Sequence, residues 1–112
     1  MKLPACESAV IPPRKLTDYL LNEWHEDGRG KALFFEHFGY TIANWEALES
    51  ALKLHAQSHE VAKVEQTPFG TRYIIEGVLE TPDGRMPLVR VVWFIDLDGG
   101  IPRLVTAYPI EE

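Results

Sequence analysis

The first part of the chain carries apolar residues at helical spacing. Four of them recur every three to four positions after a pair of prolines: Leu16, Tyr19, Leu20 and Trp24. Proline is tolerated in the first turn of a helix, so a helix is predicted from about Pro13 or Arg14. It should end before Gly28 and Gly30. The preceding residues 1–11 are interpreted as an extended arm.

Two further helices are predicted by the same spacing. A short one covers about Lys31 to Phe38, with Gly39 as its C-terminal cap. The other begins near Asn44, a good N-cap residue, and fades near Ser58. Its apolar stripe contains Trp45, Leu48, Ala51, Leu52 and His55.

After residue 60 the period changes from helical to alternating, which predicts strands. Four are expected, over Val61–Gln66, Phe69–Glu80, Leu88–Leu97 and Arg103–Tyr108. Helices followed by consecutive strands indicate an α+β fold. We therefore expect one domain over residues 1–112. Its three N-terminal helices should pack on one face of a four-stranded antiparallel sheet.

The parity of positions along the strands predicts which side chains share a face. The odd positions of the 88–97 strand are all apolar and should face the helices. Arg72 and Arg90 then fall together on the opposite, open face, provided neither strand carries a bulge. Two registers remain open for the last strand. Thr106 and Tyr108 either join the two arginines or are buried against the helices.

Composition narrows the functional classes. An apolar fraction of 46% in 112 residues is that of an ordinary globular protein. Cys6 is the single cysteine, so no intrachain disulfide is expected, and a reducing, cytoplasmic setting fits. The sequence holds no apolar run near the ~20 residues of a membrane helix. It also lacks the ligand spacing of a metal site, so we expect no membrane association, metal or cofactor.

The charge of the chain constrains a nucleic-acid function. The formal net charge is −6, and there is no run of lysines or arginines. Affinity for nucleic acid comes largely from cations that meet phosphates. Any RNA site must therefore be a local cationic patch on an acidic body.

The stretch HEDGRGK places two candidate residues close together. His25 is predicted at the C-terminal end of the first helix, where the helix dipole favours an imidazolium. Lys31 is predicted in the first turn of the next helix, where the helix dipole mildly disfavours a cation. A lysine at this position therefore suggests a role other than stabilising the helix. Both also have a plain structural interpretation, in which His25 caps the helix and Lys31 is solvated. The open face is equally compatible with a solvated surface, a partner surface or a catalytic surface.

Several segments together resemble a family of small bacterial domains of unknown function. They are YLL (Tyr19–Leu21), HEDGRGKALFFEHFGY (His25–Tyr40), FGTRYIIEG (Phe69–Gly77), TPDGR (Thr81–Arg85), VVWFID (Val91–Asp96) and PRLVTAYP (Pro102–Pro109). The order of elements also resembles the toxin ribonuclease superfamily that groups barnase, EndoU, colicin and RelE-like nucleases. Many of its members carry an early histidine and lysine, and a Thr/Ser-x-aromatic/His signature in the last strand. The matching positions are His25, Lys31, Thr106 and Tyr108.

The second resemblance implies metal-independent cleavage of RNA by a ribonuclease-like toxin. His25 would be the base or acid, since histidine titrates near neutral pH. Thr106 would hydrogen-bond a phosphate oxygen, and Tyr108 would stack on a base or orient a proton. Lys31 would contact phosphate, and the candidates for substrate binding are Arg72, Arg90 and Arg103. A small antitoxin would be the natural protein partner.

Two alternatives remain from the sequence. The acidic charge also suits a non-catalytic protein-binding module, such as an antitoxin-like or adaptor domain. An enzyme acting on a small metabolite would need a closed pocket, and no feature of the sequence indicates one.

Overall fold

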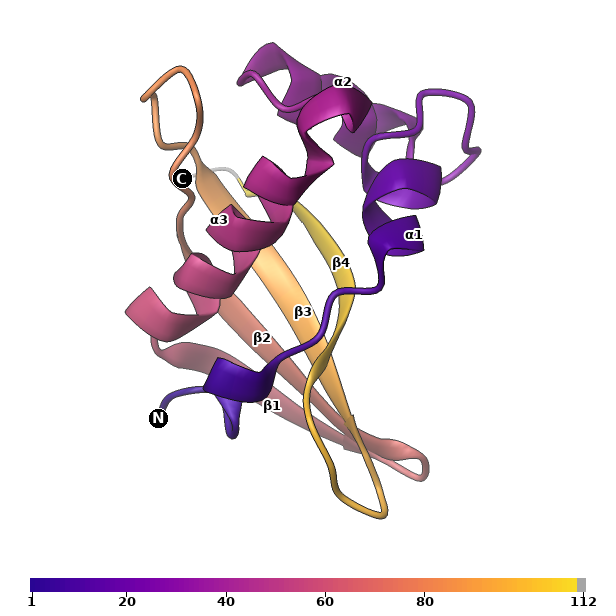
Figure 1. The fold of residues 1–112 in the computed structure, drawn as a ribbon. Helices are drawn as coiled ribbons and strands as arrows, with labels where there is room; N and C mark the ends of the chain where they lie inside the picture. The colour runs from indigo at the N-terminus through magenta and orange to yellow at the C-terminus, as the bar shows by residue number, and fades with distance from the viewer. Residues whose placement is uncertain (111–112) are drawn as a thin grey trace.

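Three helical segments cover one face of a four-stranded antiparallel sheet in the computed structural model, which describes residues 1–110 (Figure 1). The strands are neighbours in chain order: β1 (Val61–Thr67), β2 (Gly70–Val78), β3 (Leu88–Asp96) and β4 (Arg103–Pro109). The helical segments are α1 (Pro13–Lys15) with the π turn η2 (Leu16–Leu20), then α2 (Arg29–His37), and α3 (Trp45–Ser58) preceded by the short turn η3 (Ile42–Asn44). The predicted α+β fold is confirmed.

The first helix is much shorter than the spacing of its apolar residues predicts. It closes in a π turn, in which the Leu21 N–H donates to the Leu16 carbonyl at 2.8 Å. The Asn22 side chain then donates to the Asp18 carbonyl and accepts the Trp24 N–H, which gives the backbone an alternative to further helix. Trp24, expected on the apolar stripe, consequently lies in a loop with 94% of its surface exposed.

The core lies between the helices and the inner face of the sheet. Residues of α3 that follow the predicted stripe, such as Leu48 and Leu52, are fully buried there with Trp93 of β3. The odd positions Val89, Val91 and Trp93 face the helices, as parity predicts. Leu97 departs from this pattern and is exposed, because β3 ends at Asp96.

A β-bulge determines how β4 pairs with β3. Trp93 pairs with Leu104, whereas Val92 pairs with Thr106, so Val105 is the extra residue. Leu104 therefore points into the core, with 2% of its surface exposed. Beyond the bulge, Ala107 takes over the core position, Thr106 lies opposite Val92, and Tyr108 lies opposite Arg90. Neither of the two predicted registers holds for the whole strand.

The N-terminal arm connects the two edges of the sheet. The Met1 carbonyl accepts the Val61 N–H at 2.7 Å, at the start of β1. At the other edge, Val10 donates to the Pro102 carbonyl at 2.9 Å and accepts the Leu104 N–H at 3.1 Å. Between these ends the arm crosses in front of the sheet (Figure 1) and includes the short turn η1 (Cys6–Ser8). Three of its side chains are buried in the core: Leu3, Ala9 and Ile11.

Candidate functional site

Three of the residues predicted to be catalytic meet around one side chain, Tyr19. The Tyr19 hydroxyl lies 3.1 Å from the Thr106 hydroxyl of β4. The His25 ring meets the Tyr19 ring edge-on, with the ring centroids 5.0 Å apart. The Lys31 ammonium lies 5.4 Å from the centroid of the Tyr19 ring. The fold thus brings residues 25, 31 and 106 into one small region.

Local backbone features place Tyr19 at this point. It belongs to the π turn η2, a type of turn found frequently at functional sites. Gly28 lies directly against it, since a Cβ atom at residue 28 would be only 2.3 Å from the Tyr19 carbonyl oxygen. Glycine is therefore required for the loop that carries His25 to pack on the π turn.

Lys15 is a further member of this group that the sequence interpretation missed. Its ammonium also lies 5.4 Å from the Tyr19 ring centroid. Lys31 donates to the Asp27 carbonyl at 3.2 Å, and neither lysine forms an ion pair within residues 1–110. Both ammonium groups therefore keep capacity for an anion. We call the five residues the Tyr19 cluster: Lys15, Tyr19, His25, Lys31 and Thr106.

His25 has a different local role from the one predicted. It is not at the C-terminus of the first helix, because that helix already ends at Leu20. Its Nδ1 atom instead accepts two backbone N–H groups, those of Asp27 and Gly28, each at 3.0 Å. With its Nδ1 lone pair occupied in this way, the neutral imidazole carries its proton on Nε2. His25 thus offers an N–H donor on Nε2.

A cavity of about 420 Å³ opens beside the cluster. Its lining consists of Lys15, Tyr19, His25, Asp27, Val105 and Thr106. The bulge residue Val105 contributes to this wall. The Lys15 ammonium, the two hydroxyls and the His25 imidazole are groups that can bind a phosphate, whereas the Asp27 carboxylate in the same wall opposes an anion.

The predicted substrate-binding arginines lie elsewhere, on the open face, and each is paired with a carboxylate. Arg72 contacts Glu65 at 3.0 Å, and Arg103 contacts Asp96 at 3.0 Å. Arg90 contacts Glu76 at 2.5 Å and donates to the Tyr108 hydroxyl at 3.3 Å. The structure therefore brings Arg90 and Tyr108 together, two residue pairs along the strands from Thr106 and Val92. It leaves Arg72 and Arg103 in separate ion pairs.

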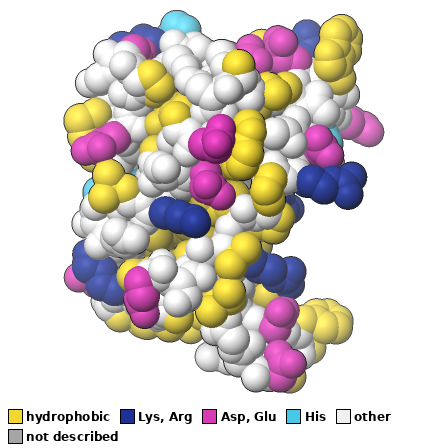
Figure 2. Space-filling view, in the orientation of Figure 1, with side chains coloured by type: hydrophobic (Ala, Val, Ile, Leu, Met, Phe, Trp, Pro, Cys, Tyr) yellow, Lys and Arg dark blue, Asp and Glu magenta, His cyan; other side chains and the backbone are white. Residues whose placement is uncertain are grey.

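Charged side chains are mixed over the face of the molecule that carries the helices. Figure 2 shows basic and acidic groups interspersed there, without a continuous basic area. The Tyr19 cluster places two ammonium groups, those of Lys15 and Lys31, against one tyrosine ring of this acidic chain.

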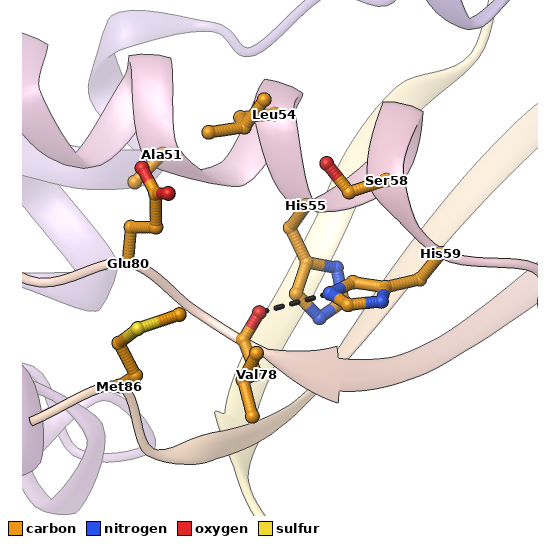
Figure 3. Close-up of a pocket in the computed structure, with 8 residues that line it drawn as sticks. All are labelled: Ala51, Leu54, His55, Ser58, His59, Val78, Glu80 and Met86. Carbon is orange, nitrogen blue, oxygen red and sulfur yellow. Dashed lines mark hydrogen bonds between the residues drawn. The ribbon is translucent and has the colours of Figure 1, made fainter.

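A separate hollow lies between α3 and the end of β2 (Figure 3). It measures about 100 Å³, and the His55 and His59 rings form part of its wall, with centroids 4.7 Å apart. Both rings already donate to backbone carbonyls, His59 to Val78 and His55 to Gly77 and Val89. The hollow therefore adds no free imidazole N–H donor to the candidate site.

Residues 1–110 contain neither a candidate metal site nor a helix that could span a membrane. No three or more histidine, cysteine or acidic side chains are grouped so that they could hold a metal ion. In the same part of the chain, every helix is too short or too polar to span a bilayer.

The chain belongs to the DUF6883 family, a domain of unknown function whose model matches residues 2–111. No protein with a curated description matches it. Among solved structures, it is similar to one chain of a contact-dependent growth inhibition toxin–immunity protein complex from Klebsiella pneumoniae 342. The TM-score is 0.72 at 19% identity, over 96% of this chain and 98% of the other. At that identity the similarity establishes the fold.

Proposed function

We propose that this DUF6883 domain is a ribonuclease-like toxin component of a toxin–antitoxin type system and cleaves RNA without a metal ion. The observation that supports the proposal is the Tyr19 cluster. His25 lies in the loop before α2, and Lys31 lies in the first turn of α2. Both meet Thr106 of the last strand around Tyr19. These are three of the four positions that the resemblance to toxin ribonucleases indicates.

The reaction proposed is attack of a ribose 2′-hydroxyl on the adjacent phosphate, in which the P–O2′ bond forms as the P–O5′ bond breaks. A base takes the proton of the 2′-hydroxyl, and an acid gives a proton to the departing 5′-oxygen. The transition state places additional negative charge on the phosphate oxygens, which preorganised donors stabilise. The ammonium groups of Lys15 and Lys31 would supply positive charge. The Thr106 hydroxyl and the His25 Nε2–H would supply hydrogen bonds. For His25 to act as a base at Nε2, its proton would first have to move to Nδ1 and displace two amide hydrogen bonds.

A neutralising protein partner is part of this proposal. A ribonuclease acting in the cytoplasm, the compartment that the lone Cys6 suggests, would damage its own cell unless it were inhibited. The similar solved structure comes from a toxin–immunity protein complex, which supports a small antitoxin or immunity-like partner.

The proposal is tested with the purified chain, residues 1–112, on cellular RNA in the presence of a chelator. His25→Ala should lower the cleavage rate by roughly a hundredfold or more, in the range lost with a catalytic donor or acid–base group. The matched control is His37→Ala, which removes an exposed histidine on α2. Tyr108→Phe tests whether the Arg90–Tyr108 pair participates. RNA that stays intact with well-folded wild-type protein would refute the proposal.

A second candidate function is a non-catalytic, antitoxin-like or adaptor module. It is favoured by the net charge of −6 and by the carboxylate beside each open-face arginine. In that case a stable complex with a protein partner should form, His25→Ala should leave it unchanged, and RNA should remain intact.

A further inference from the structure

The most exposed large apolar side chain of the described residues is Trp24, which immediately precedes His25. An indole left in water forgoes the stabilisation that burial of so large a side chain brings. Hydrogen bonds nevertheless fix the loop around it. The Trp24 N–H donates to the Asn22 side chain at 2.9 Å, and the Arg29 N–H donates to the His25 carbonyl at 2.9 Å. The indole is therefore held outward by a structured loop.

Trp24 lines a surface hollow of about 180 Å³ together with Glu23 and Arg29. Neither charged side chain forms an ion pair within residues 1–110. The hollow thus offers an indole, a planar guanidinium and a carboxylate that accepts hydrogen bonds.

These three groups together discriminate among ligands. A cationic side chain from a protein would suit Trp24 and Glu23, but Arg29 would repel it. A phosphate would suit Arg29, but Glu23 would repel it. A neutral planar ring that carries an amino group suits all three, because it can stack on the indole and the guanidinium while it donates to the carboxylate. Nucleobases have this chemistry.

We infer that the Glu23–Trp24–Arg29 hollow binds one nucleobase of the RNA, beside the phosphate held at the Tyr19 cluster. The inference rests on the proposed function and specifies how the substrate would be recognised. Since Trp24 and His25 are consecutive, the base belongs to a nucleotide next to the bound phosphate. The Glu23 carboxylate favours adenine, cytosine or guanine, which carry an exocyclic amino group, over uracil, which carries none.

The first test is binding of short 2′-O-methyl oligonucleotides, which cannot be cleaved because the 2′-hydroxyl is blocked. Trp24 is the exposed member of the three tryptophans, since Trp93 is buried and Trp45 is half-buried, so it should respond most strongly in fluorescence. Trp24→Ala should raise the Kd about tenfold, within the range for loss of a stacking aromatic residue. It should leave the salt dependence of binding unchanged, because no cation is removed. Lys31→Ala should reduce that slope by about 0.7.

The second test is base preference. Wild-type protein should bind oligoadenylate and oligocytidylate several times more tightly than oligouridylate, in line with the discrimination of polar base contacts. Glu23→Gln should remove that preference, because an amide can also donate to the uracil carbonyl. Arg29→Lys keeps the charge but loses the planar group, so it should weaken binding of all these oligonucleotides.

The outcomes separate this inference from the proposed function. If wild-type and Trp24→Ala proteins cleave and bind RNA equally well, the base site is wrong and the ribonuclease stands. Stronger quenching of Trp24 by a lysine-rich peptide than by oligonucleotides would assign the hollow to a protein partner and overturn the inference. Failure of the wild-type protein both to bind and to cleave RNA would overturn the two proposals together.

Discussion

A buried histidine, His55, shows how strongly position determines the chemistry of a residue. Only 2% of its surface is exposed, and its Nε2–H is shared between the carbonyls of Gly77 at 3.1 Å and Val89 at 3.3 Å. Its Nδ1 atom has no hydrogen-bond partner among the described residues. Burial, followed by the proximity of His59, lowers the pKa of His55 to about 4 despite these carbonyl contacts.

This lowered pKa predicts a loss of stability in mild acid. Between the ordinary histidine pKa of 6.5 and about 4, the unfolded chain binds a proton at His55 that the folded chain does not. The free energy of unfolding should therefore fall as pH drops through that window, by at most about 3 kcal/mol from this residue. Urea denaturation at several pH values measures it.

The matched variant for this measurement is His55→Gln, which keeps a side-chain N–H donor but does not titrate in that window. Its stability should depend less on pH between about 4 and 6.5 than that of the wild-type protein. Parallel curves for the two proteins would show that His55 titrates normally in the fold.

Only some residues of the Tyr19 cluster could be predicted from the sequence. His25, Lys31 and Thr106 were identified through a motif resemblance, and the structure brings them together. Tyr19 and Lys15 were missed, although their spacing of four positions puts them side by side on a helical turn. Tyr19 was assigned to the apolar stripe because a tyrosine at helical spacing looks like a core residue.

At the scale of elements, the bulge at Val105 determines what β4 contributes. It lets one strand supply Leu104 and Ala107 to the core while Thr106 reaches Tyr19. Alternation alone would give Leu104 and Thr106 the same environment, since they are two positions apart. The extra residue separates them.

Because of the bulge, truncating two neighbouring side chains of β4 should lower the stability of the fold by different amounts. Leu104→Ala should lower the free energy of unfolding by about 2–4 kcal/mol, because it leaves a cavity in the core. Val105→Ala should cost about 1 kcal/mol or less, since Val105 is only half-buried. Chemical denaturation compares the two. A larger loss for Val105→Ala would mean that the strand follows an uninterrupted register.

Most helices and strands were predictable because each follows one period over several turns or residue pairs. The exceptions are places where a few hydrogen bonds override the period. The Asn22 side chain ends the first helix early, and one inserted residue changes the parity of β4. Local contacts of this kind do not appear in an apolar pattern.

At the scale of the whole molecule, the excess of acidic residues leaves each arginine of the open face beside a carboxylate. These arginines are held by Glu65, Glu76 and Asp96, so little free positive charge remains beside the Tyr19 cluster. Exposed ion pairs of this type add little stability, typically up to about 1 kcal/mol. Their main effect should be on the binding of anions.

Under the proposed ribonuclease function, release of Arg90 should therefore improve RNA binding. Glu76→Gln removes the carboxylate partner of Arg90 and should increase the slope of log affinity against log salt by about 0.7, the value for one additional phosphate contact. Glu46→Gln is the control, because it makes the same change of charge on the exposed side of α3. Equal effects of the two substitutions would show that only net charge matters. Filter binding at several salt concentrations measures both.

The N-terminal arm links folding to the order of protein synthesis. Val10 precedes its backbone partners, Pro102 and Leu104, by 92 and 94 positions, so it is made long before them. The core therefore cannot close on the ribosome until β4 has emerged. The same delay applies to the contact between Tyr19 and Thr106. A nascent chain thus carries no complete Tyr19 cluster, and whatever chemistry the cluster performs can begin only after Thr106 has left the ribosome.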